Sequence, residues 1–419
     1  MHSLLEKFKV FAVNTGIADN AYIVGGAVRD ILCGKEPVDV DIAVEGDAIA
    51  IAREFAAIEK ASFVLMNQDF GTGRIVKNSL TLDLSRLHGD SIVLDLSERD
   101  ITINAMALPL YFGCNPTVGL IDPLRGADDL AHGVVRMVSK ENFIKDPLRL
   151  LRTYRFAAEP GFFIEDMTRG MLISLAHMIS SVSVERVAAE LRLILKFDES
   201  YRTIKAMADG GLLSGIFPVM TGRDVLKLYM EVERVLNDLS VCFPSSVLPY
   251  FGKPLLKPCL KLSCLFQSAE DAIDACIGLK MSIKEISYIG KTVEYRDTIE
   301  ELFRDKKPLD SVEMISLLRQ LGEDIYSVAV LTVARAGSGC ASLVDYCREL
   351  ILFYQRPFTD RLGLLPLVTG DDLISEFHIK PSPLFGDILG AVENMVLEGR
   401  VATREQALKV AGDMVDRLQ

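Results

Sequence analysis

The pattern of apolar and polar positions divides the chain into an amino-terminal part with strands and a longer helical part. Up to residue 138, short apolar runs alternate with helical spacing, and the runs Ala21–Val24, Val38–Val44 and Leu80–Leu84 are predicted strands. Beyond residue 140 the strand signal nearly stops, and apolar residues recur at helical spacing to the carboxyl terminus. This order predicts an α/β or α+β head followed by an all-helical remainder.

The same spacing predicts the remaining elements of the head. The further helices are 1–20, Ala27–Cys33 and Ala48–Ile58, and the further strands are Phe63–Met66 and Arg74–Lys77. Another helix is predicted after Ser97, with Asp100 and Asn104 on one face because they are four residues apart. Its packing face would contain Ile101, Ala105 and Leu108.

The stretch YIVGGAVRDILCGKEPVDVDIAV carries the first candidate chemistry. Its apolar run ends in Gly25-Gly26, and glycines let backbone amides approach phosphate oxygens closely. Arg29 follows as a cationic donor, and Asp39 and Asp41 share one face of a strand. Two neighbouring carboxylates repel each other unless a cation lies between them, and oxygen ligands suit Mg²⁺. The unit therefore predicts a phosphate site beside a divalent metal.

Asp83 is a candidate third carboxylate for this site. It alternates with the leucines of the predicted strand Leu80–Leu84, as Asp41 alternates with the apolar residues Val38, Val40, Ile42 and Val44 of its own strand. A solvated carboxylate at the sheet edge is the alternative interpretation.

Basic residues recur on the helix PLRLLRTYRFAA. Asp146 before Pro147 is a favoured start for this helix. Arg149, Arg152 and Arg155 then recur every third residue and form a slowly winding cationic stripe. Such a stripe is ordinarily a solvated face, but close to a phosphate site it indicates an anion-binding surface.

Composition narrows the class of protein. A chain of 419 residues is too long to form a single compact core, so several domains are expected. A composition of 49% apolar and 25% charged residues is ordinary for a folded soluble protein. No apolar run approaches the ~20 residues of a membrane span, and the amino terminus lacks a signal-peptide pattern. Eight cysteines without a CxxC pair fit free thiols in a reducing cytoplasm, and five histidines without an HxH or HExxH pattern argue against a histidine-based metal hydrolase. The net charge of −12 argues mildly against nucleic-acid binding, although a local basic face can coexist with it.

The motifs, taken in order, resemble a known family. GGAVRD followed by DVD resembles the signature of polymerase-beta-like nucleotidyltransferases in the class II group of bacterial tRNA nucleotidyltransferases and poly(A) polymerases. RDITINAMAL, IDPLRGADDL, KDPLRLLRTYRFAA and VERVAAEL resemble the later motifs of that family, and LVTGDDLI with GRVATREQAL resembles the tail of tRNA nucleotidyltransferases. The resemblance implies an α+β fold, with a mixed-sheet nucleotidyltransferase head at 1–138, a helical neck at 139–200, a helical body at 201–355 and a helical tail at 356–419.

The resemblance also implies roles for single residues. Asp39 and Asp41 match the catalytic metal ligands, with two Mg²⁺ ions expected during catalysis and Asp83 as a further ligand. Asp146 and Arg149 match the pair that reads the base, and an acceptor beside a donor suits the amine and ring acceptor of cytosine and adenine. The residues implied in nucleotide binding are Gly25, Gly26, Arg29, Arg99, Asp100, Asn104, Asp146, Arg149, Arg152 and Arg155.

Three departures from the family pattern concern base selection. Lys145 replaces the Glu of EDxxR, which orients the base-reading arginine in the family. Glu98 replaces the first Arg of RRD and removes a positive charge near the site. The segment from Asp83 to Arg99 is short for the family, which favours a specialist that adds only CC or only A. The stretch KLSCLFQ also lacks the His-Asp of the phosphohydrolase module found in some members.

We therefore expect a cytoplasmic, template-independent tRNA nucleotidyltransferase. The 3′-hydroxyl of tRNA would attack the α-phosphate of CTP or ATP, and pyrophosphate would leave. Its partners would be the tRNA 3′ end and CTP, ATP or both, without a membrane or an obligate protein partner. A poly(A) polymerase shares the head motifs and is the nearest alternative. A non-catalytic RNA-binding relative is a second alternative, against which intact Asp39 and Asp41 argue.

Overall fold

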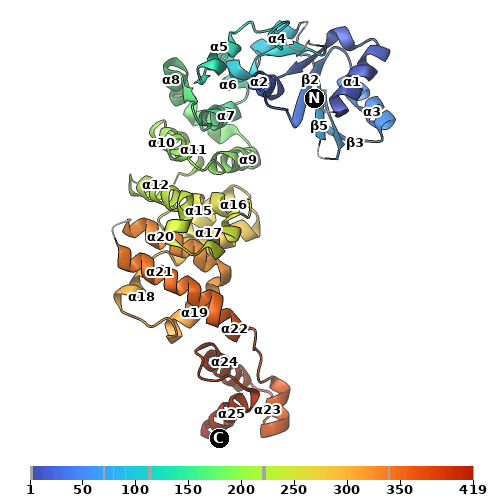
Figure 1. Cartoon of the computed structure of the whole chain (residues 1–419). Helices are drawn as coiled ribbons and strands as arrows, with labels where there is room; N and C mark the ends of the chain where they lie inside the picture. The colour runs from blue at the N-terminus through green and yellow to red at the C-terminus, as the bar shows by residue number, and fades with distance from the viewer. Residues whose placement is uncertain are drawn as a thin grey trace. The chain divides into compact units, whose positions relative to one another are not determined.

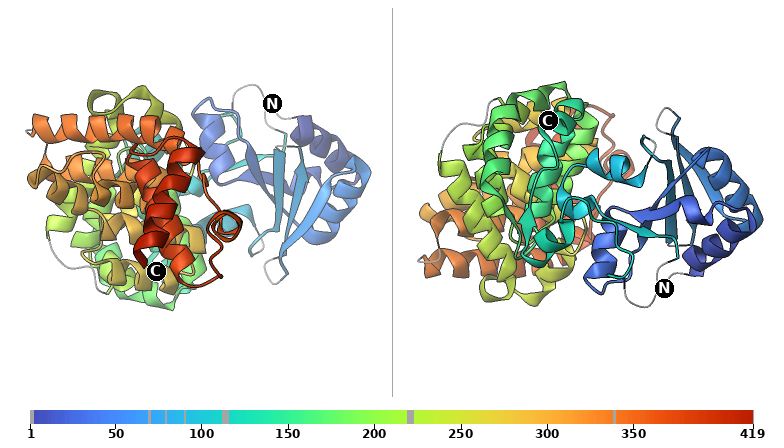
Figure 2. Two further views of the ribbon diagram at one scale, coloured as in Figure 1. Left: turned by 90° about the horizontal axis from the view of Figure 1, so that it is seen from below. Right: turned by 90° about the horizontal axis from the view of Figure 1, so that it is seen from above.

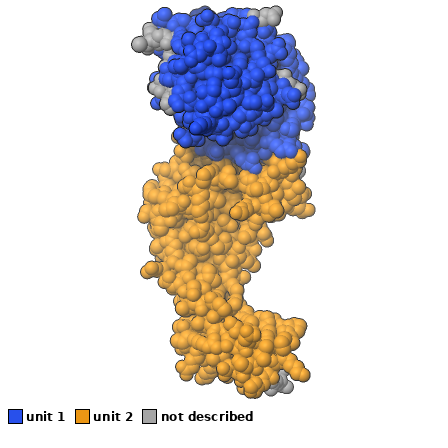
Figure 3. All heavy atoms as spheres, turned by 90° about the vertical axis from the view of Figure 1, so that its right-hand side faces the viewer, with its two compact units in different colours: residues 1–197, 202–218 blue, residues 198–201, 219–419 orange. Residues whose placement is uncertain are grey.

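The chain forms two compact units (Figure 3), which comprise residues 1–197 with 202–218 and residues 198–201 with 219–419. The computed structural model describes residues 3–68, 71–78, 80–89, 91–111, 116–218, 223–337 and 340–418. Cys114 lies outside these ranges, and none of the other seven cysteines, all in the described part of the chain, forms a disulfide. None of the described helices is both long and apolar enough to cross a bilayer. The finer division into head, neck, body and tail stays a prediction.

A mixed six-stranded sheet forms the centre of the first unit (Figure 1). Across the sheet the strands are β3 (Ser62–Asn67), β4 (Thr72–Lys77), β5 (Leu80–Arg86), β2 (Asp39–Val44), β1 (Ala21–Val24) and β6 (Ala107–Pro109). β2 and β5 are parallel, and the other neighbouring strands are antiparallel. The predicted mixed sheet with helices is confirmed, and the carboxylates of β2 lie near its middle.

Helices cover both faces of this sheet (Figure 2). α1 (Ser3–Asn14) and α3 (Ala48–Glu59) bury apolar residues in the larger core on one face, and α4 (Ile92–Ser97) does so in a smaller core on the other. The predicted helix over 1–20 ends early, because Gly16 takes a φ of 76° and a separate short turn, η1 (Ala18–Asn20), follows.

The period of two along β2 decides where its carboxylates lie. Val40, Ile42 and Val44 are buried in the larger core, whereas Ala43 belongs to the smaller core beside α4. Asp39 and Asp41 alternate with the first set and therefore share the opposite face, as predicted, which is the α4 side. The prediction that Val38 joins the apolar face is wrong. Pairing with β5 begins at Asp39, and Val38 is 61% exposed.

The segment after Ser97 differs most from its prediction. A continuous helix was expected there, but residues Thr102–Asn104 form a short 3-10 helix, η2, and Ala107–Pro109 form β6. Leu108 pairs with Ile23, because the otherwise free edge of β1 supplies hydrogen-bond partners for an extended backbone. Ile101, Ala105 and Leu108 are all buried, as expected, so apolar spacing located the packing residues but not the conformation.

The rest of the first unit is mainly helical. Its elements are α2 (Gly26–Leu32), α5 (Gly126–Ala131), β7 (Val134–Val135), α6 (Lys140–Lys145), α7 (Leu148–Ala157), β8 (Phe163–Ile164), α8 (Asp166–Leu175), η3 (Ala176–Ser181), α9 (Val184–Leu195), α10 (Tyr201–Asp209) and α11 (Leu212–Ile216). α7 begins at Leu148 with Pro147 at its N-cap, one residue later than predicted, and Asp146 Oδ1 accepts a 3.4 Å hydrogen bond from the backbone N–H of Leu148.

The described part of the second unit consists of helices and loops. Its helices are α12 (Arg223–Asn237), α13 (Leu239–Cys242), η4 (Ser245–Val247), α14 (Leu248–Phe251), α15 (Leu256–Ser263), α16 (Ala269–Gly278), α17 (Ile283–Glu294), α18 (Thr298–Arg304), α19 (Val312–Leu321), η5 (Gly322–Asp324), α20 (Ile325–Ala336), α21 (Ala341–Phe353), η6 (Tyr354–Phe358), α22 (Thr359–Leu362), α23 (Gly370–Phe377), α24 (Leu384–Leu397) and α25 (Arg404–Leu418). α20 is buried along most of its length, and α23, α24 and α25 share a separate apolar core.

Candidate functional site: an arginine-lined cavity

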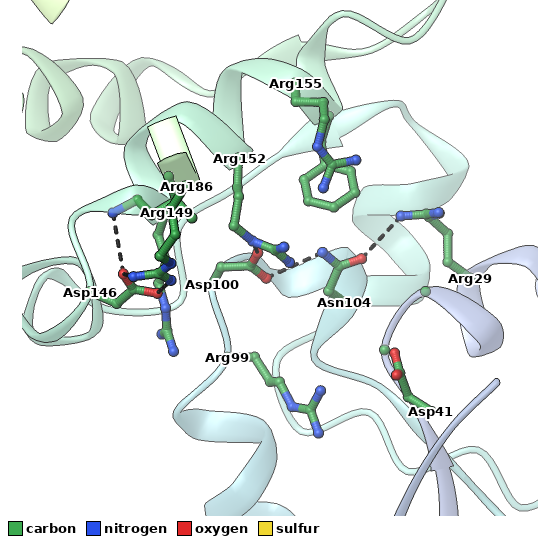
Figure 4. A pocket seen from close by; sticks show the side chains of 14 residues that line it. Arg29, Asp41, Arg99, Asp100, Asn104, Asp146, Arg149, Arg152, Arg155 and Arg186 are labelled. Atoms are coloured by element: carbon green, nitrogen blue, oxygen red, sulfur yellow. Dashed lines mark hydrogen bonds and ion pairs between the residues drawn. The ribbon is translucent and has the colours of Figure 1, made fainter. Parts of the chain in front are cut away.

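A cavity of about 430 Å³ lies in the first unit beside the turn between β1 and α2 (Figure 4). Its lining residues are Gly25, Gly26, Arg29, Asp41, Arg99, Asp100, Asn104, Asp146, Leu148, Arg149, Arg152, Arg155, Phe156 and Arg186. The structure thus brings together all predicted site residues except Asp39 and Asp83. The lining holds six arginines against three aspartates, a cationic excess that suits a polyphosphate.

The glycine turn sets the backbone close to the acidic strand. Gly25 has φ 69° and ψ −135°, a conformation that is essentially restricted to glycine. A β-carbon there would also stand 3.4 Å from Asp41 Oδ2 and 3.5 Å from Arg99 Nη1. Gly25 is therefore required by the backbone conformation. It places the first residues of α2 beside Asp41.

Of the two carboxylates on β2, Asp41 is the one that lines the cavity. Burial raises its pKa above the ordinary value, and the negative charges of Asp83 and Asp39 raise it further. Arg99 and Arg152 act in the opposite direction without cancelling this effect. An ionised Asp41 beside Asp39 is therefore short of positive charge, and a divalent cation at this strand would supply it.

Asp83 lies next to Asp41 in register but is already paired. Arg74 donates to it bidentately, with Nε 2.7 Å from Oδ1 and Nη2 2.6 Å from Oδ2. In the part of the chain that the structure describes, no three His, Cys, Asp or Glu side chains group closely enough to hold a metal ion. The carboxylates that fit a metal are Asp39 and Asp41, and Asp83 would join them by releasing Arg74.

A hydrogen-bonded network crosses the cavity wall from α2 to α7. Arg29 Nη1 donates to Asn104 Oδ1 at 3.1 Å, and Asn104 Nδ2 donates to Asp100 Oδ1 at 3.2 Å. Arg152 Nε donates to the other Asp100 oxygen at 2.8 Å. Burial alone would raise the pKa of Asp100, but Arg152 and the hydrogen bonds of Asn104 and the Ile101 backbone outweigh it and hold that pKa below the ordinary value. Asp100 is consequently a buried carboxylate that stays charged.

Phe156 and Glu190 hold the arginine stripe in place. The guanidinium carbons of Arg155, Arg29 and Arg152 lie 4.2, 5.3 and 5.7 Å from the centroid of the Phe156 ring. Glu190 of α9 accepts a 2.7 Å hydrogen bond from Arg155 Nε, and its Oε1 lies 3.7 Å from Arg152 Nη1. These contacts hold the three guanidinium groups apart from one another and orient them toward the cavity.

The predicted base-reading pair lies at the other end of the cavity. Both carboxylate oxygens of Asp146 accept hydrogen bonds from Arg186, at 3.1 and 3.0 Å. Arg149 Nη1 donates to the backbone oxygen of Glu98 at 2.6 Å. Burial lowers the pKa of Arg149, and the nearby Asp100 and Asp146 charges partly offset that effect.

A second cavity of about 760 Å³ shares this end of the site. Its lining residues are Asn67, Ser85, His88, Asp95, Glu98, Arg99, Lys145, Asp146, Arg149 and Arg186. Asp95 is buried and accepts from Arg99 Nη2 at 2.8 Å, which fixes that arginine between the two cavities. The shared wall consists of Arg99, Asp146, Arg149 and Arg186.

The motif IDPLRGADDL, residues 121–130, supports the site from behind. Its second half forms α5, where Asp129 accepts a 2.6 Å hydrogen bond from Thr102 of η2. A β-carbon on Gly126 would come within 2.1 Å of the Thr102 carbonyl oxygen, so glycine is required for this close approach. α5 thereby fixes η2, which carries Asn104.

Four lining or supporting residues lay outside the predicted site: Leu148, Phe156, Arg186 and Glu190. Arg186 and Glu190 are four residues apart on one predicted helix, so the helical period could have identified them as one polar face. Phe156 reads as an ordinary packing residue in the sequence, and nothing in its spacing indicates that three arginines gather on its ring.

The mixed sheet, the Gly-only turn and the arginine-lined cavity, together with the match to a polymerase head, define the class of this protein as a nucleotidyltransferase. Residues 21–136 match the family model described as the Poly A polymerase head domain. Residues 161–222 match an RNA and SrmB binding site of polymerase A, and residues 259–411 match tRNA nucleotidyltransferase domain 2.

Relatives of known activity match nearly the whole chain. A CC-adding tRNA nucleotidyltransferase of Synechocystis sp. is 30% identical over 407 residues, which cover 94% of this chain and 93% of the relative. An A-adding tRNA nucleotidyltransferase of Halalkalibacterium halodurans is 26% identical over 419 residues, with coverage of 96% and 90%. The chain belongs to the family of tRNA nucleotidyltransferases and poly(A) polymerases, and it is an enzyme.

Solved structures show the same fold. The Thermotoga maritima CCA-adding enzyme complexed with tRNA aligns with a TM-score of 0.71 at 23% identity, over 99% of this chain and 95% of that chain. Membership of the family also indicates a divalent metal cofactor.

Proposed function

We propose that this enzyme adds C, A or both to the 3′ end of tRNA from CTP and ATP, without a nucleic-acid template, and releases pyrophosphate. The observation that carries this proposal is the cavity in which Asp41, six arginines and the Asp146–Arg149 pair converge. The names of the relatives, which are CC-adding and A-adding tRNA nucleotidyltransferases, favour tRNA over the poly(A) alternative. The reaction would take place in the cytoplasm.

The triphosphate would bind at the glycine turn. Gly25 and Gly26 expose backbone close to Asp41, and Arg29 points into the cavity from α2. Arg152 and Arg155 face the same space from α7. Guanidinium groups bind phosphate oxygens with paired, charge-assisted hydrogen bonds, so this end of the cavity suits the phosphates.

Asp39 and Asp41 would hold the divalent metal, for which we propose two Mg²⁺ ions. Metal bound there would lower the pKa of the attacking hydroxyl and neutralise charge on the phosphates. Both aspartates face the same side of β2, and the raised pKa of Asp41 indicates a carboxylate that lacks a compensating cation. Asp83 is a further proposed ligand, and it would have to release Arg74 to bind the metal.

The base and the sugar would be positioned by fixed polar groups. Asp146 can accept from an exocyclic amine while Arg149 donates to a ring nitrogen or carbonyl, which suits cytosine and adenine. Arg186 fixes the carboxylate plane of Asp146 through its two hydrogen bonds. Asp100 and Asn104 would contact the ribose, and Arg99 would hold the nucleotide at the wall shared by both cavities.

The second cavity offers a place for the last nucleotide of the tRNA, because it adjoins Arg99 and Arg149. The helical body and tail would bind the acceptor arm by its shape and phosphates, as proteins bind duplex RNA. The short segment between Asp83 and Arg99 favours a CC-only or A-only specialist. The two relatives above include one of each kind, so their names leave the specialisation open.

The test is incorporation of labelled CTP and ATP into tRNA transcripts that lack CCA, lack CA or lack only the terminal A. Incorporation into one or more of them supports the proposal, and the pattern separates CCA-, CC- and A-adding enzymes. An unstructured RNA without a tRNA fold serves as the control. Preferential extension of that RNA, or no incorporation into any tRNA, would refute the proposed substrate.

A further inference from the structure

Glu98 and Lys145, the two residues that depart from the family motifs, contact each other. Lys145 Nζ lies 3.2 Å from Glu98 Oε1. Glu98 directly follows α4, and Lys145 is the last residue of α6 and directly precedes Asp146. The ion pair therefore joins the end of α4 to the end of α6. Both side chains line the second cavity.

Glu98 also holds Arg149 through its backbone. Its carbonyl oxygen accepts the 2.6 Å hydrogen bond from Arg149 Nη1, while its carboxylate accepts from Lys145. A movement of the Glu98 segment would therefore move the guanidinium of Arg149. Lys145 restrains that movement at the side chain, and the hydrogen bond transmits it at the main chain.

We infer that Glu98 and Lys145 form a positioning pair that sets the orientation of Arg149 and thereby the selection of the incoming base. This inference rests on the proposed function for the identity of the substrate. The two side chains touch no part of the first cavity, so they act through Arg149 and Asp146 and make no contact with the nucleotide there.

The ion pair between Glu98 and Lys145 should affect the orientation of Arg149 more than the stability of the fold. The side chains of Lys145 and Glu98 are 64% and 48% exposed, and exposed ion pairs add little to the free energy of folding. An arginine that must meet a planar base, in contrast, depends strongly on its orientation, because small displacements weaken paired hydrogen bonds. Breaking the pair should therefore change nucleotide selectivity while the melting temperature stays nearly constant.

A charge-exchange series tests the pair in the full-length chain. The variants are Glu98→Arg, Lys145→Glu and the double variant, and direct binding of CTP, ATP and UTP is measured beside incorporation. Each single variant should weaken binding of the preferred nucleotide by about fivefold to tenfold relative to UTP, as coupled neighbours do. The double variant, which restores an ion pair with the charges exchanged, should recover to within about twofold of the parent.

The matched control is Arg169→Glu on α8. It breaks another exposed ion pair, 2.7 Å long, with Asp166, and the residues of this pair line neither cavity. It should leave nucleotide selectivity unchanged. Glu98→Gln and Lys145→Gln provide milder versions should a charge reversal disturb folding, and they should show the same direction of change.

Three results would contradict the positioning role of Glu98 and Lys145. They are unchanged selectivity in both single variants, a double variant no better than the worse single variant, and a Lys145→Glu variant that binds better than the parent. The last result would mean that a glutamate at this position acts by itself. Loss of tRNA incorporation in the parent chain would refute the proposed function instead, and nucleotide binding would still decide the role of the pair.

Discussion

Charged side chains gather at two places, and the two differ in balance and in access. The cavity of the first unit holds six arginines against three aspartates and opens to solvent. In the second unit, Lys261 and Glu233 form a 2.6 Å ion pair whose side chains are 2% and 7% exposed. Glu233 also accepts hydrogen bonds from the hydroxyl and backbone N–H of Ser200, at 2.6 and 2.8 Å.

The difference separates a ligand site from a structural cluster. Lys261 and Glu233 neutralise each other, and both carboxylate oxygens of Glu233 accept hydrogen bonds from the protein. This buried cluster is therefore not suited to bind a ligand. The lining of the cavity, in contrast, contains six arginines and three aspartates, and Arg149 is held by a backbone oxygen, so a polyanion can bind there. A charged group therefore indicates a binding function when it is accessible from a cavity, and burial alone does not.

The largest effect is expected from Asp41→Asn in the cavity. Loss of a proposed metal ligand should reduce incorporation by about a thousandfold or more, since metal charge stabilisation is worth several kcal/mol. The raised pKa of Asp41 means that its ionised form opposes folding near neutral pH. The neutral amide should therefore keep or slightly raise the melting temperature, and tRNA binding should stay nearly intact. Near-normal turnover would contradict the metal assignment.

The buried cluster should respond in the opposite way. Lys261→Met leaves Glu233 buried without its cation and should lower the free energy of unfolding by about 3–5 kcal/mol. CTP binding by the remaining folded protein should not change, because neither residue lines the nucleotide cavity. Denaturant unfolding and CTP titration measure the two quantities. The double variant Lys261→Met/Glu233→Gln removes both charges and should recover part of the loss; equal instability would argue against an electrostatic cause.

Arg149→Ala should relax base selection. Removal of the proposed base-reading donor should reduce discrimination of CTP and ATP against UTP by about tenfold to a hundredfold, as expected for loss of a charged hydrogen bond. Competition between labelled nucleotides in the incorporation assay measures the ratio. Arg169→Ala, on the exposed face of α8, is the control for loss of one positive charge. An unchanged ratio in Arg149→Ala would exclude the reading role.

The smallest effect is expected for Asp100→Asn and depends on pH. The pKa of Asp100 is held below its ordinary value of 3.8, so its contribution to stability is complete above that pH and is lost as the pH falls through the lower, folded-state value. The variant should be less stable than the parent by about 1 kcal/mol at pH 6. Unfolding curves between pH 6 and pH 2 should converge toward the acid end, and a constant difference would contradict the assigned pKa direction.

Much of the fold followed from periodicity. The strands at Ala21–Val24 and Leu80–Leu84 and the helical character beyond residue 140 were predicted, because period two and helical spacing are local properties of the chain. The helix expected after Ser97 was wrong, because β6 forms by pairing with β1, and a strand partner more than 80 residues away leaves no local signal.

The candidate site was predicted in part for the same reason. The residue type and spacing of motif residues such as Gly25, Asp41 and Arg152 indicate a phosphate or metal site, and in the structure these residues line one cavity. Arg186 and Phe156 were missed, because their importance lies in what they touch. Asp83 was treated as a free carboxylate, whereas cross-strand pairing gives it Arg74 as a partner.

The sequence by itself determined the family, the mixed sheet with its helical remainder and most of the candidate site residues, because these depend on residue type and local spacing. The tertiary structure decided which charges are compensated. It paired Glu98 with Lys145, Asp146 with Arg186 and Lys261 with Glu233, and it lined one cavity with six arginines and three aspartates. Compensation depends on distances between residues far apart in the chain, and only the folded chain sets those distances.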